Sequence, residues 1–314
     1  MAAIYSKLIS TGSYLPSKIL TNQDIEKMVD TSDKWILERT GIKQRHIAST
    51  EESSVDMAFH ASMKAINLVS INKQDIDMII VATTTPERKF PSSAVLLQNK
   101  LKIKNAFAFD VNAACTGFIF AIDIADKYIK NGTAKNVLVV GTEKITSLLD
   151  WSDRNTCVLF GDGAGSIILT ASDKPGIISS FIESDGSYKD LLTVNTDQEF
   201  IEMKGNDVFK IAVNTLSQVA LHTLQKNNIN CEDLDWFIPH QANSRIITSI
   251  AKKINLPENK IIMTVDKHGN TSAASIPLAL DDAFLSGKIQ KNDLLMLEAF
   301  GAGFTWGSTL LYFN

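Results

Sequence analysis

The sequence predicts an α/β fold made of two similar halves. Short β-branched runs at 78–81 (MIIV) and 137–140 (VLVV) have the pattern of buried strands. They alternate with longer amphipathic stretches at 55–68 and 116–130, which have helical spacing. This alternation predicts layers of helices around a mostly parallel central sheet.

An internal repeat indicates the two halves. Residues 74–80 (QDIDMII) resemble 232–238 (EDLDWFI) at an offset of 158, and 135–140 (KNVLVV) resemble 291–296 (KNDLLM) at an offset of 156. Chance similarity is the alternative, because an acidic link before a strand is common in α/β segments.

A third pair with a similar offset makes chance the weaker explanation. Gly132 and Gly287, each expected to end a helix before one of these strands, are 155 positions apart. We therefore predict that residues 1–170 and 171–314 are two halves packed about a pseudo-two-fold axis. An active site is expected where they meet.

Composition excludes several classes of protein. The chain has 314 residues, of which 45% are hydrophobic and 21% charged, and a net charge of −4. That length supports a core without disulfides, and the charge argues against a nucleic-acid partner. No apolar run approaches the ~18 residues of a membrane span, and the first residues lack a secretory signal. Three scattered cysteines form neither a disulfide framework nor a metal motif, so we expect a cytoplasmic protein without a metal.

Cys115 is the strongest candidate nucleophile. An apolar strand at 106–111 runs into small residues, then Cys115, and then the helical stretch 116–130. At a helix start the backbone N–H groups and the macrodipole stabilise a thiolate. A lone cysteine is more often a small buried hydrophobe, which is our interpretation of Cys157 and Cys231.

The repeat points to the partners of this cysteine. A shift of about 158 carries Cys115 to 267–275 (KHGNTSAAS), the matching turn of the second half, which offers the neutral donor Asn270. His240 follows the apolar run 236–239, and strand ends commonly carry functional residues in α/β folds. The remaining histidines lack such a setting, except His268, which stays open as a weaker candidate than Asn270.

Two glycine-rich loops could suggest a nucleotide site. Residues 160–165 (FGDGAG) lack the last glycine of GxGxxG, and the chain has no P-loop motif. We predict instead a tight strand-to-strand connection with a close backbone approach. Residues 299–303 (AFGAG) follow a strand and are placed to direct a backbone N–H at a developing oxyanion.

Six segments carry motifs in an order and spacing typical of one known family. They are 29–36 (VDTSDKWI), 38–42 (ERTGI), 110–119 (DVNAACTGFI), 238–246 (IPHQANSRI), 269–280 (GNTSAASIPLAL) and 298–307 (EAFGAGFTWG). Together they resemble β-ketoacyl-acyl-carrier-protein synthase III, the condensing enzyme that initiates bacterial type II fatty acid synthesis. The resemblance covers nearly the whole chain. It implies a thiolase-like fold, with two duplicated halves in a layered α-β-α-β-α architecture.

The resemblance implies a catalytic triad of Cys115, His240 and Asn270. Cys115 would accept an acyl group, typically acetyl, from acyl-CoA. His240 and Asn270 would bind the thioester carbonyl of malonyl-carrier protein and stabilise the enolate formed as CO₂ leaves. The carbanion would attack acyl-Cys115 without any cofactor. Elongating condensing enzymes use two histidines, so the asparagine favours the initiating type.

The resemblance also assigns the walls of the site. The amides of Cys115 and Ala302 would hold the second oxyanion, and the alanine, where glycine is usual, is expected to restrict the loop. Phe300 would face the malonyl carboxylate as an apolar wall. Phe90 would close the acyl pocket of the partner in a homodimer, and Asn243 would hold water or substrate.

Two sets of binding residues follow from the same resemblance. The nucleotide end of CoA is assigned to Thr31, Trp35, Arg39 and Arg154, with Trp35 and Arg154 on the two sides of the adenine. The acidic acyl carrier protein is assigned to Lys210, Arg245, Lys252 and Lys253. For Lys252 and Lys253 a solvated helix face is an equally good interpretation.

Three alternatives stay open on the sequence. A related acyltransferase of secondary metabolism would differ in its acyl acceptor. A non-catalytic homologue should lack the cysteine or one of its partners, and a redox sensor normally has a second cysteine close by. The preferred acyl chain is also open, because pocket depth depends on Phe90, on 191–203 and on the partner subunit.

Overall fold

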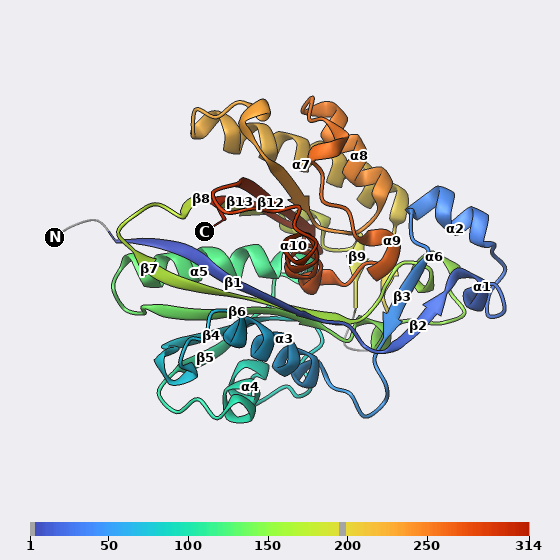
Figure 1. Cartoon of the computed structure of the whole chain (residues 1–314). Helices are drawn as coiled ribbons and strands as arrows, with labels where there is room; N and C mark the ends of the chain where they lie inside the picture. Colours follow the sequence, from blue (N-terminus) through green and yellow to red (C-terminus); the bar gives the residue numbers. More distant parts are fainter. Residues whose placement is uncertain (1–3, 195–198, 314) are drawn as a thin grey trace.

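Two sheets and three layers of helices alternate through the molecule (Figure 1). The computed structural model describes residues 4–194 and 199–313. The first sheet has the order β1 (Tyr5–Tyr14), β7 (Gly163–Ser172), β6 (Asn136–Glu143), β4 (Met78–Ala82) and β5 (Phe107–Val111). The second has the order β11 (Trp236–Pro239), β12 (Leu294–Gly301), β13 (Thr305–Tyr312) and β8 (Ile177–Ser184). The boundary predicted at residue 170 thus falls two residues before the end of β7.

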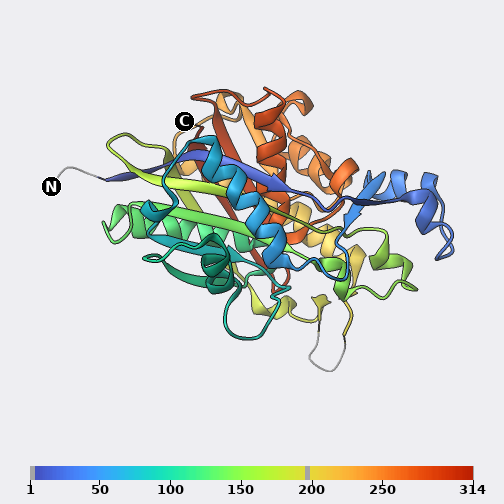
Figure 2. The same ribbon diagram turned by 60° about the horizontal axis from the view of Figure 1, so that its bottom comes forward.

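Helices cover both outer faces and fill the space between the sheets. The outer layer on the first sheet is α3 (Ser54–Leu68) and α4 (Ser93–Leu101), and Figure 2 shows α3 crossing β1 and β7. The central layer is α5 (Gly117–Lys130) and α10 (Ser275–Leu285), and the outer layer on the second sheet is α7 (Gly205–Lys226) and α8 (Ser244–Lys253). One apolar core joins α5 and α10 to both sheets. The five layers agree with the architecture that the resemblance implied.

The local residue pattern predicted the positions of the main strands and helices correctly, but not the direction in which the strands pair. The strands expected at 78–81 and 137–140 lie within β4 and β6, and the helices expected at 55–68 and 116–130 are α3 and α5. The expectation of a mostly parallel sheet is wrong. Within the two main sheets, β5–β4, β4–β6 and β11–β12 pair in parallel, and the other four described pairs are antiparallel. Antiparallel neighbours need no long crossover, so β12 and β13 follow each other directly through a short turn.

The repeat has a structural counterpart in two aspartates 158 positions apart. Asp77 precedes β4, and its Oδ2 accepts the N–H of Asn136 at 2.9 Å. Asp235 precedes β11, and its Oδ2 accepts the N–H of Leu294 at 2.7 Å. Each aspartate therefore ties the start of one strand to its parallel neighbour.

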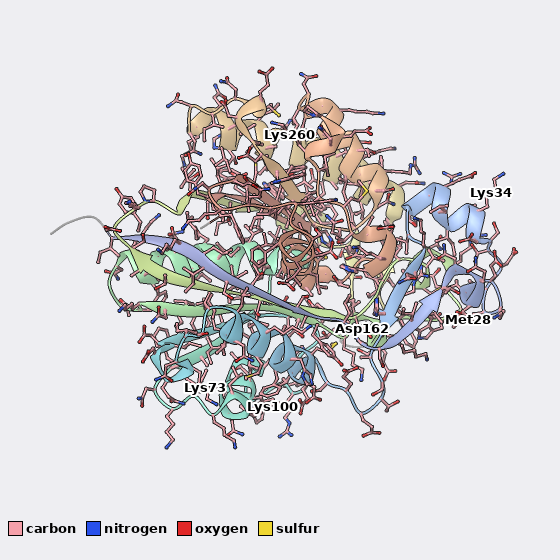
Figure 3. The ribbon with its side chains drawn as sticks, in the orientation of Figure 1. Met28, Lys34, Lys73, Lys100, Asp162 and Lys260 are labelled. Atoms are coloured by element: carbon pink, nitrogen blue, oxygen red, sulfur yellow. The ribbon has the colours of Figure 1, made fainter. Side chains whose placement is uncertain are left out.

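A small lobe extends from one end of the sheets. It contains β2 (Lys18–Thr21), β3 (Gln44–Ile47), α1 (Asn22–Ile25), α2 (Asp33–Thr40), α6 (Arg154–Cys157) and α9 (Val265–His268). Met28 and Lys34 are at its tip in Figure 3. Its core includes Ile36 and Cys157, so the predicted packing role of that cysteine agrees with its burial. A two-stranded sheet of β9 (Leu192–Thr193) and β10 (Glu202–Met203) lies before α7.

The loop at 160–165 connects a helix to a strand, so the predicted strand-to-strand connection is wrong. It follows α6 and leads into β7. The close approach is present: a Cβ on Gly161 would lie 2.6 Å from the carbonyl oxygen of His268. Asp162, which is buried and is labelled toward the small lobe in Figure 3, holds the loop by accepting the N–H groups of Thr146 and Ala48. No helix in the described part of the chain is long and apolar enough to cross a membrane.

Candidate active site

Cys115 lies between two cavities. The first, of about 410 Å³, extends from Trp35, Arg39 and Arg245 inward to Cys115. The second, of about 500 Å³, continues on the other side of the cysteine. The apolar side chains of the second cavity include Ile145, Leu148, Phe160, Leu192, Val194 and Ile201. Residues 195–198, part of the segment expected to shape the acyl pocket, lie outside the described residues.

Cys115 stands on a 3-10 turn, Ala114–Thr116, directly before α5. The end of β12 packs against this turn, since a Cβ on Gly301 would lie 2.8 Å from the amide nitrogen of Cys115. Burial raises the pKa of Cys115 to about 12, which outweighs the lowering effect of a hydrogen bond from Ser272. This effect of burial opposes the thiolate expected from the helix start, while the side chain itself is half-exposed between the two cavities. The thiolate at Cys115 stays a prediction.

His240 is held as a neutral donor. Its Nδ1 lies 2.6 Å from Oγ of Ser275, and this oxygen also accepts the N–H of Gln241 at 3.2 Å. Which of the two groups donates depends on the tautomer of the ring. When the hydroxyl donates to Nδ1, the imidazole proton lies on Nε2, which is the tautomer that gives the cavity an N–H donor. Burial lowers the pKa of His240 to about 4, so the ring is uncharged at neutral pH.

Asn270, which belongs to the same half of the chain as His240, faces the same cavity. Its Oδ1 accepts the N–H of Ser272 at 2.9 Å, and its backbone bonds to Leu159 and Gly161. Because Oδ1 is engaged, Nδ2 is the group that the side chain can offer to a ligand. The first cavity thus brings together the thiol, an imidazole N–H and an amide N–H.

The residues predicted to form the walls of the site do not all line the same cavity. Phe300 lines the first cavity and packs on Phe304 with 4.5 Å between ring centroids, whereas Ala302 lines the second cavity. Asn243 lines the first cavity, but its side chain caps α8 and bonds the carbonyl of Arg39 at 3.0 Å. Phe90 lines neither cavity and is 85% exposed on the loop before α4.

Two of the predicted CoA residues lie at the mouth of the first cavity. Trp35 and Arg39 line it, and the guanidinium of Arg154 lies 5.0 Å from the Trp35 ring centroid. An adenine on that ring face would have to displace the guanidinium. Thr31 lines neither cavity, and its buried hydroxyl has no hydrogen-bond partner within the described ranges.

The predicted carrier-protein residues are exposed on α7 and α8, which pack side by side (Figure 1). They are Lys210, Arg245, Lys252 and Lys253. Arg245 lines the first cavity and lies over the ring of Phe209, with 5.3 Å to the centroid. Lys253 bonds Oδ1 of Asn214 on α7. Arg245 is therefore the one of the four that adjoins the cavity.

Sequence reasoning missed three polar residues of the site. Ser272 and Ser275 belong to the motif GNTSAAS but had been given no role, and Glu143 ends the buried strand β6. An acid at the end of an otherwise apolar strand was the available signal for Glu143.

Comparisons with known proteins agree on one family. Two family models match the chain, 3-oxoacyl-(acyl-carrier-protein) synthase III over residues 109–186 and its C-terminal region over 224–313. A β-ketoacyl-(acyl-carrier-protein) synthase III of Thioalkalivibrio sulfidiphilus is 53% identical, covering 98% of this chain and 99% of its own.

Two solved structures also match nearly the whole chain. The 3-oxoacyl-(acyl-carrier-protein) synthase III of Aquifex aeolicus has a TM-score of 0.96 and 48% identity, over 98% of this chain and 100% of its own. The priming β-ketosynthase of a polyketide biosynthetic pathway has a TM-score of 0.96 and 33% identity, over 99% and 97%. The chain has the thiolase-like fold of these enzymes and belongs to the β-ketoacyl-(acyl-carrier-protein) synthase III family of acyltransferases.

Proposed function

We propose that this enzyme condenses acetyl-CoA, or another short acyl-CoA, with malonyl-carrier protein. The products are a 3-oxoacyl-carrier protein, CoA and CO₂, and the reaction starts fatty acid synthesis. The observation that carries the proposal is the position of Cys115 between two cavities, with His240 and Asn270 in one of them.

In the first half-reaction Cys115 attacks the acyl-CoA thioester. CoA enters through the first cavity, with its nucleotide near Trp35 and Arg39, so the thioester reaches the thiol at the inner end. The acyl chain enters the second cavity, whose apolar lining suits a short hydrocarbon. The amides of Cys115 and Ala302 stabilise the oxyanion.

In the second half-reaction malonyl-carrier protein loses CO₂. Nε2–H of His240 and Nδ2–H of Asn270 donate to the thioester oxygen, where negative charge develops. Phe300 is an apolar wall that disfavours the carboxylate. The carbanion then attacks acyl-Cys115. Both steps use only the thiol, neutral donors and backbone amides, and so call for no cofactor.

The carrier protein is proposed to dock on α7 and α8, with Arg245 beside the cavity mouth. The proposals of a homodimer and of a cytoplasmic location rest on the family. An 85% exposed phenylalanine, Phe90, is the kind of side chain that a second copy would cover.

A priming acyltransferase of secondary metabolism is the second candidate, favoured by the 33% identity to the polyketide enzyme. The two functions differ in the acceptor. Turnover with malonyl-carrier protein of fatty acid synthesis supports the first, and turnover only with another acceptor supports the second.

The direct test is intact-mass spectrometry after mixing with a panel of acyl-CoAs. Acetyl-CoA should add one acetyl group, located on the peptide that contains Cys115. Cys115→Ser should lose the adduct, because a hydroxyl is a much weaker nucleophile, whereas Cys157→Ser should keep it. An adduct on Cys157 or Cys231 would contradict the assignment.

A further inference from the structure

Gln241 is a buried side-chain amide next to the active site. His240 and Ala242, its neighbours in the chain, line the first cavity, whereas Gln241 lines neither cavity and is 1% exposed. It is therefore out of reach of both substrates. Neither half-reaction uses this side chain directly, so any part it plays in catalysis must act through other residues.

Every hydrogen-bonding group of this side chain has a backbone partner. Nε2 donates to the carbonyl oxygens of Pro239 at 2.7 Å and Ile262 at 3.2 Å. Oε1 accepts the N–H groups of Thr264 at 2.8 Å and Val265 at 3.2 Å. Two N–H donors and two acceptor positions are the full capacity of a side-chain amide. Reversing the amide would set its oxygen against two carbonyls, so these partners fix its orientation.

These four bonds join the strand that precedes His240 to the segment that leads to Asn270. Pro239 is the last residue of β11, and His240 follows it directly. Val265 is the first residue of α9, and only Gly269 separates the end of that helix from Asn270. The amide of one residue thus spans the two stretches of chain that carry the enolate donors.

A second link holds the chain on the other side of Asn270. Oγ of Ser275 lies 2.6 Å from Nδ1 of His240 and accepts the backbone N–H of Gln241 at 3.2 Å. Asn270 therefore lies in a stretch whose two ends, 264–265 and Ser275, are both bonded to residues that directly follow β11.

The backbone of Asn270 bonds to a different part of the molecule. Its N–H donates to the carbonyl of Leu159 at 2.8 Å, and its carbonyl accepts the N–H of Gly161 at 3.0 Å. Both partners belong to the loop between α6 and β7. Since these bonds do not involve β11, the spacing between Asn270 and His240 depends on the links made by residues 240 and 241.

We propose that Gln241 is a positioning residue that sets the spacing between the imidazole of His240 and the side-chain amide of Asn270. Each donor must lie about 2.7–3.1 Å from the same enolate oxygen. Without the four bonds of Gln241, the segment 262–265 can shift relative to β11 and carry Asn270 with it. A misplacement of about 1 Å can cost about 10²-fold in rate.

This role rests on the proposed function and affects one half-reaction only. Acyl transfer uses the thiol of Cys115 and backbone amides, which the four bonds of Gln241 do not reach. Decarboxylation needs both side-chain donors. Because they act on charge that develops in the transition state, misplacing them should lower kcat for CO₂ release and leave the KM for malonyl-carrier protein nearly unchanged.

Two variants of the full-length enzyme test the role. Acetyl transfer to Cys115 is followed by quenched intact-mass spectrometry, and CO₂ release from labelled malonyl-carrier protein is measured on the same preparations. Gln241→Met has a similar volume but removes all four bonds, so CO₂ release should fall by ~10²-fold, while acetyl transfer changes by only a few-fold. Gln241→Asn keeps the amide but is one methylene shorter. It cannot span both stretches at their present spacing, so its CO₂ release should lie between those of Gln241→Met and the wild type.

The ratio of the two rates separates positioning from a loss of folded protein, because both rates scale with the amount of folded enzyme. Asn136→Leu is the matched control. Asn136 is also a buried amide, outside both cavities, whose Nδ2 donates to the carbonyl of Asp75 at 2.8 Å and whose Oδ1 accepts the hydroxyl of Thr170 at 2.6 Å. This variant should lower the melting temperature and leave the ratio unchanged.

A wild-type ratio in either Gln241 variant would overturn the positioning role, and so would an equal change of the ratio in Asn136→Leu. Should Gln241→Met fail to fold, Gln241→Asn still decides the question. A wild type that carries no acetyl group on Cys115, or that releases no CO₂, would instead refute the proposed function.

Discussion

Nδ1 of His240, the residue that directly follows β11, lies 2.6 Å from Oγ of Ser275, the first residue of α10. The same oxygen also accepts the N–H of Gln241. With the hydroxyl donating to Nδ1, the imidazole proton lies on Nε2. A neutral ring with one fixed N–H is the form that can stabilise an enolate oxygen.

Ser275→Ala should therefore impair decarboxylation. Without the hydroxyl, the ring can rotate or change tautomer. Partners that orient metal-binding histidines are worth about 10- to 100-fold, and we expect CO₂ release to fall by a similar factor here, while acetyl transfer to Cys115 stays near the wild-type rate. Equal rates of CO₂ release in variant and wild type would show that Ser275 does not orient the ring.

His240→Ala and Asn270→Ala should separate the two half-reactions more completely. Each removes one donor to the developing negative charge, a loss typically worth ~10²–10³-fold in rate. Both variants should still become acetylated on Cys115. A parallel assay of labelled acetyl transfer and labelled CO₂ release is the measurement. Wild-type decarboxylation by Asn270→Ala would refute the role of that residue.

Arg245→Glu should weaken the use of malonyl-carrier protein through charge repulsion, and salt should weaken the wild-type interaction. The KM for malonyl-carrier protein should rise, with little change in acetyl transfer from acetyl-CoA. Lys252→Glu, on the same helix but outside the cavity lining, is the comparison. A similar loss of both activities would mean that Arg245 serves CoA binding or folding.

Glu298 should make the protein less stable as pH rises. Its carboxyl is buried, both oxygens lack a hydrogen-bond partner within the described chain, and burial raises its pKa well above the usual range. The native state therefore holds a proton that the unfolded chain loses above about pH 4.3. Stability is full below that pH and falls as pH rises, by at most about 1.4 kcal/mol per pH unit.

Glu298→Gln removes this titration. The free energy of unfolding in urea, measured at pH 5.5 and pH 8, should favour the variant increasingly at the higher pH. A difference between the two proteins that does not depend on pH would contradict a buried, protonated Glu298.

The sequence alone determined the elements and the family. The spacing of apolar residues and the residue types are local properties, and they located β4, β6, α3 and α5. The motifs around Cys115, His240 and Asn270 identified the family. The roles of those three residues, and the boundary between residues 170 and 171, stay predictions. The prediction of a mostly parallel sheet was wrong, because the residue pattern of one strand does not show whether its neighbour runs parallel or antiparallel to it.

Only the tertiary structure decided the protonation states and the contacts that set them. Ser275 is 35 positions from His240, and Ser272 is 129 positions from Glu143, so no local pattern links either pair. The sequence suggested a thiolate at Cys115 from its helix start, whereas desolvation acts in the opposite direction and raises the pKa of the thiol. Desolvation depends on how completely the two halves cover a group, and that coverage exists only once they have packed together.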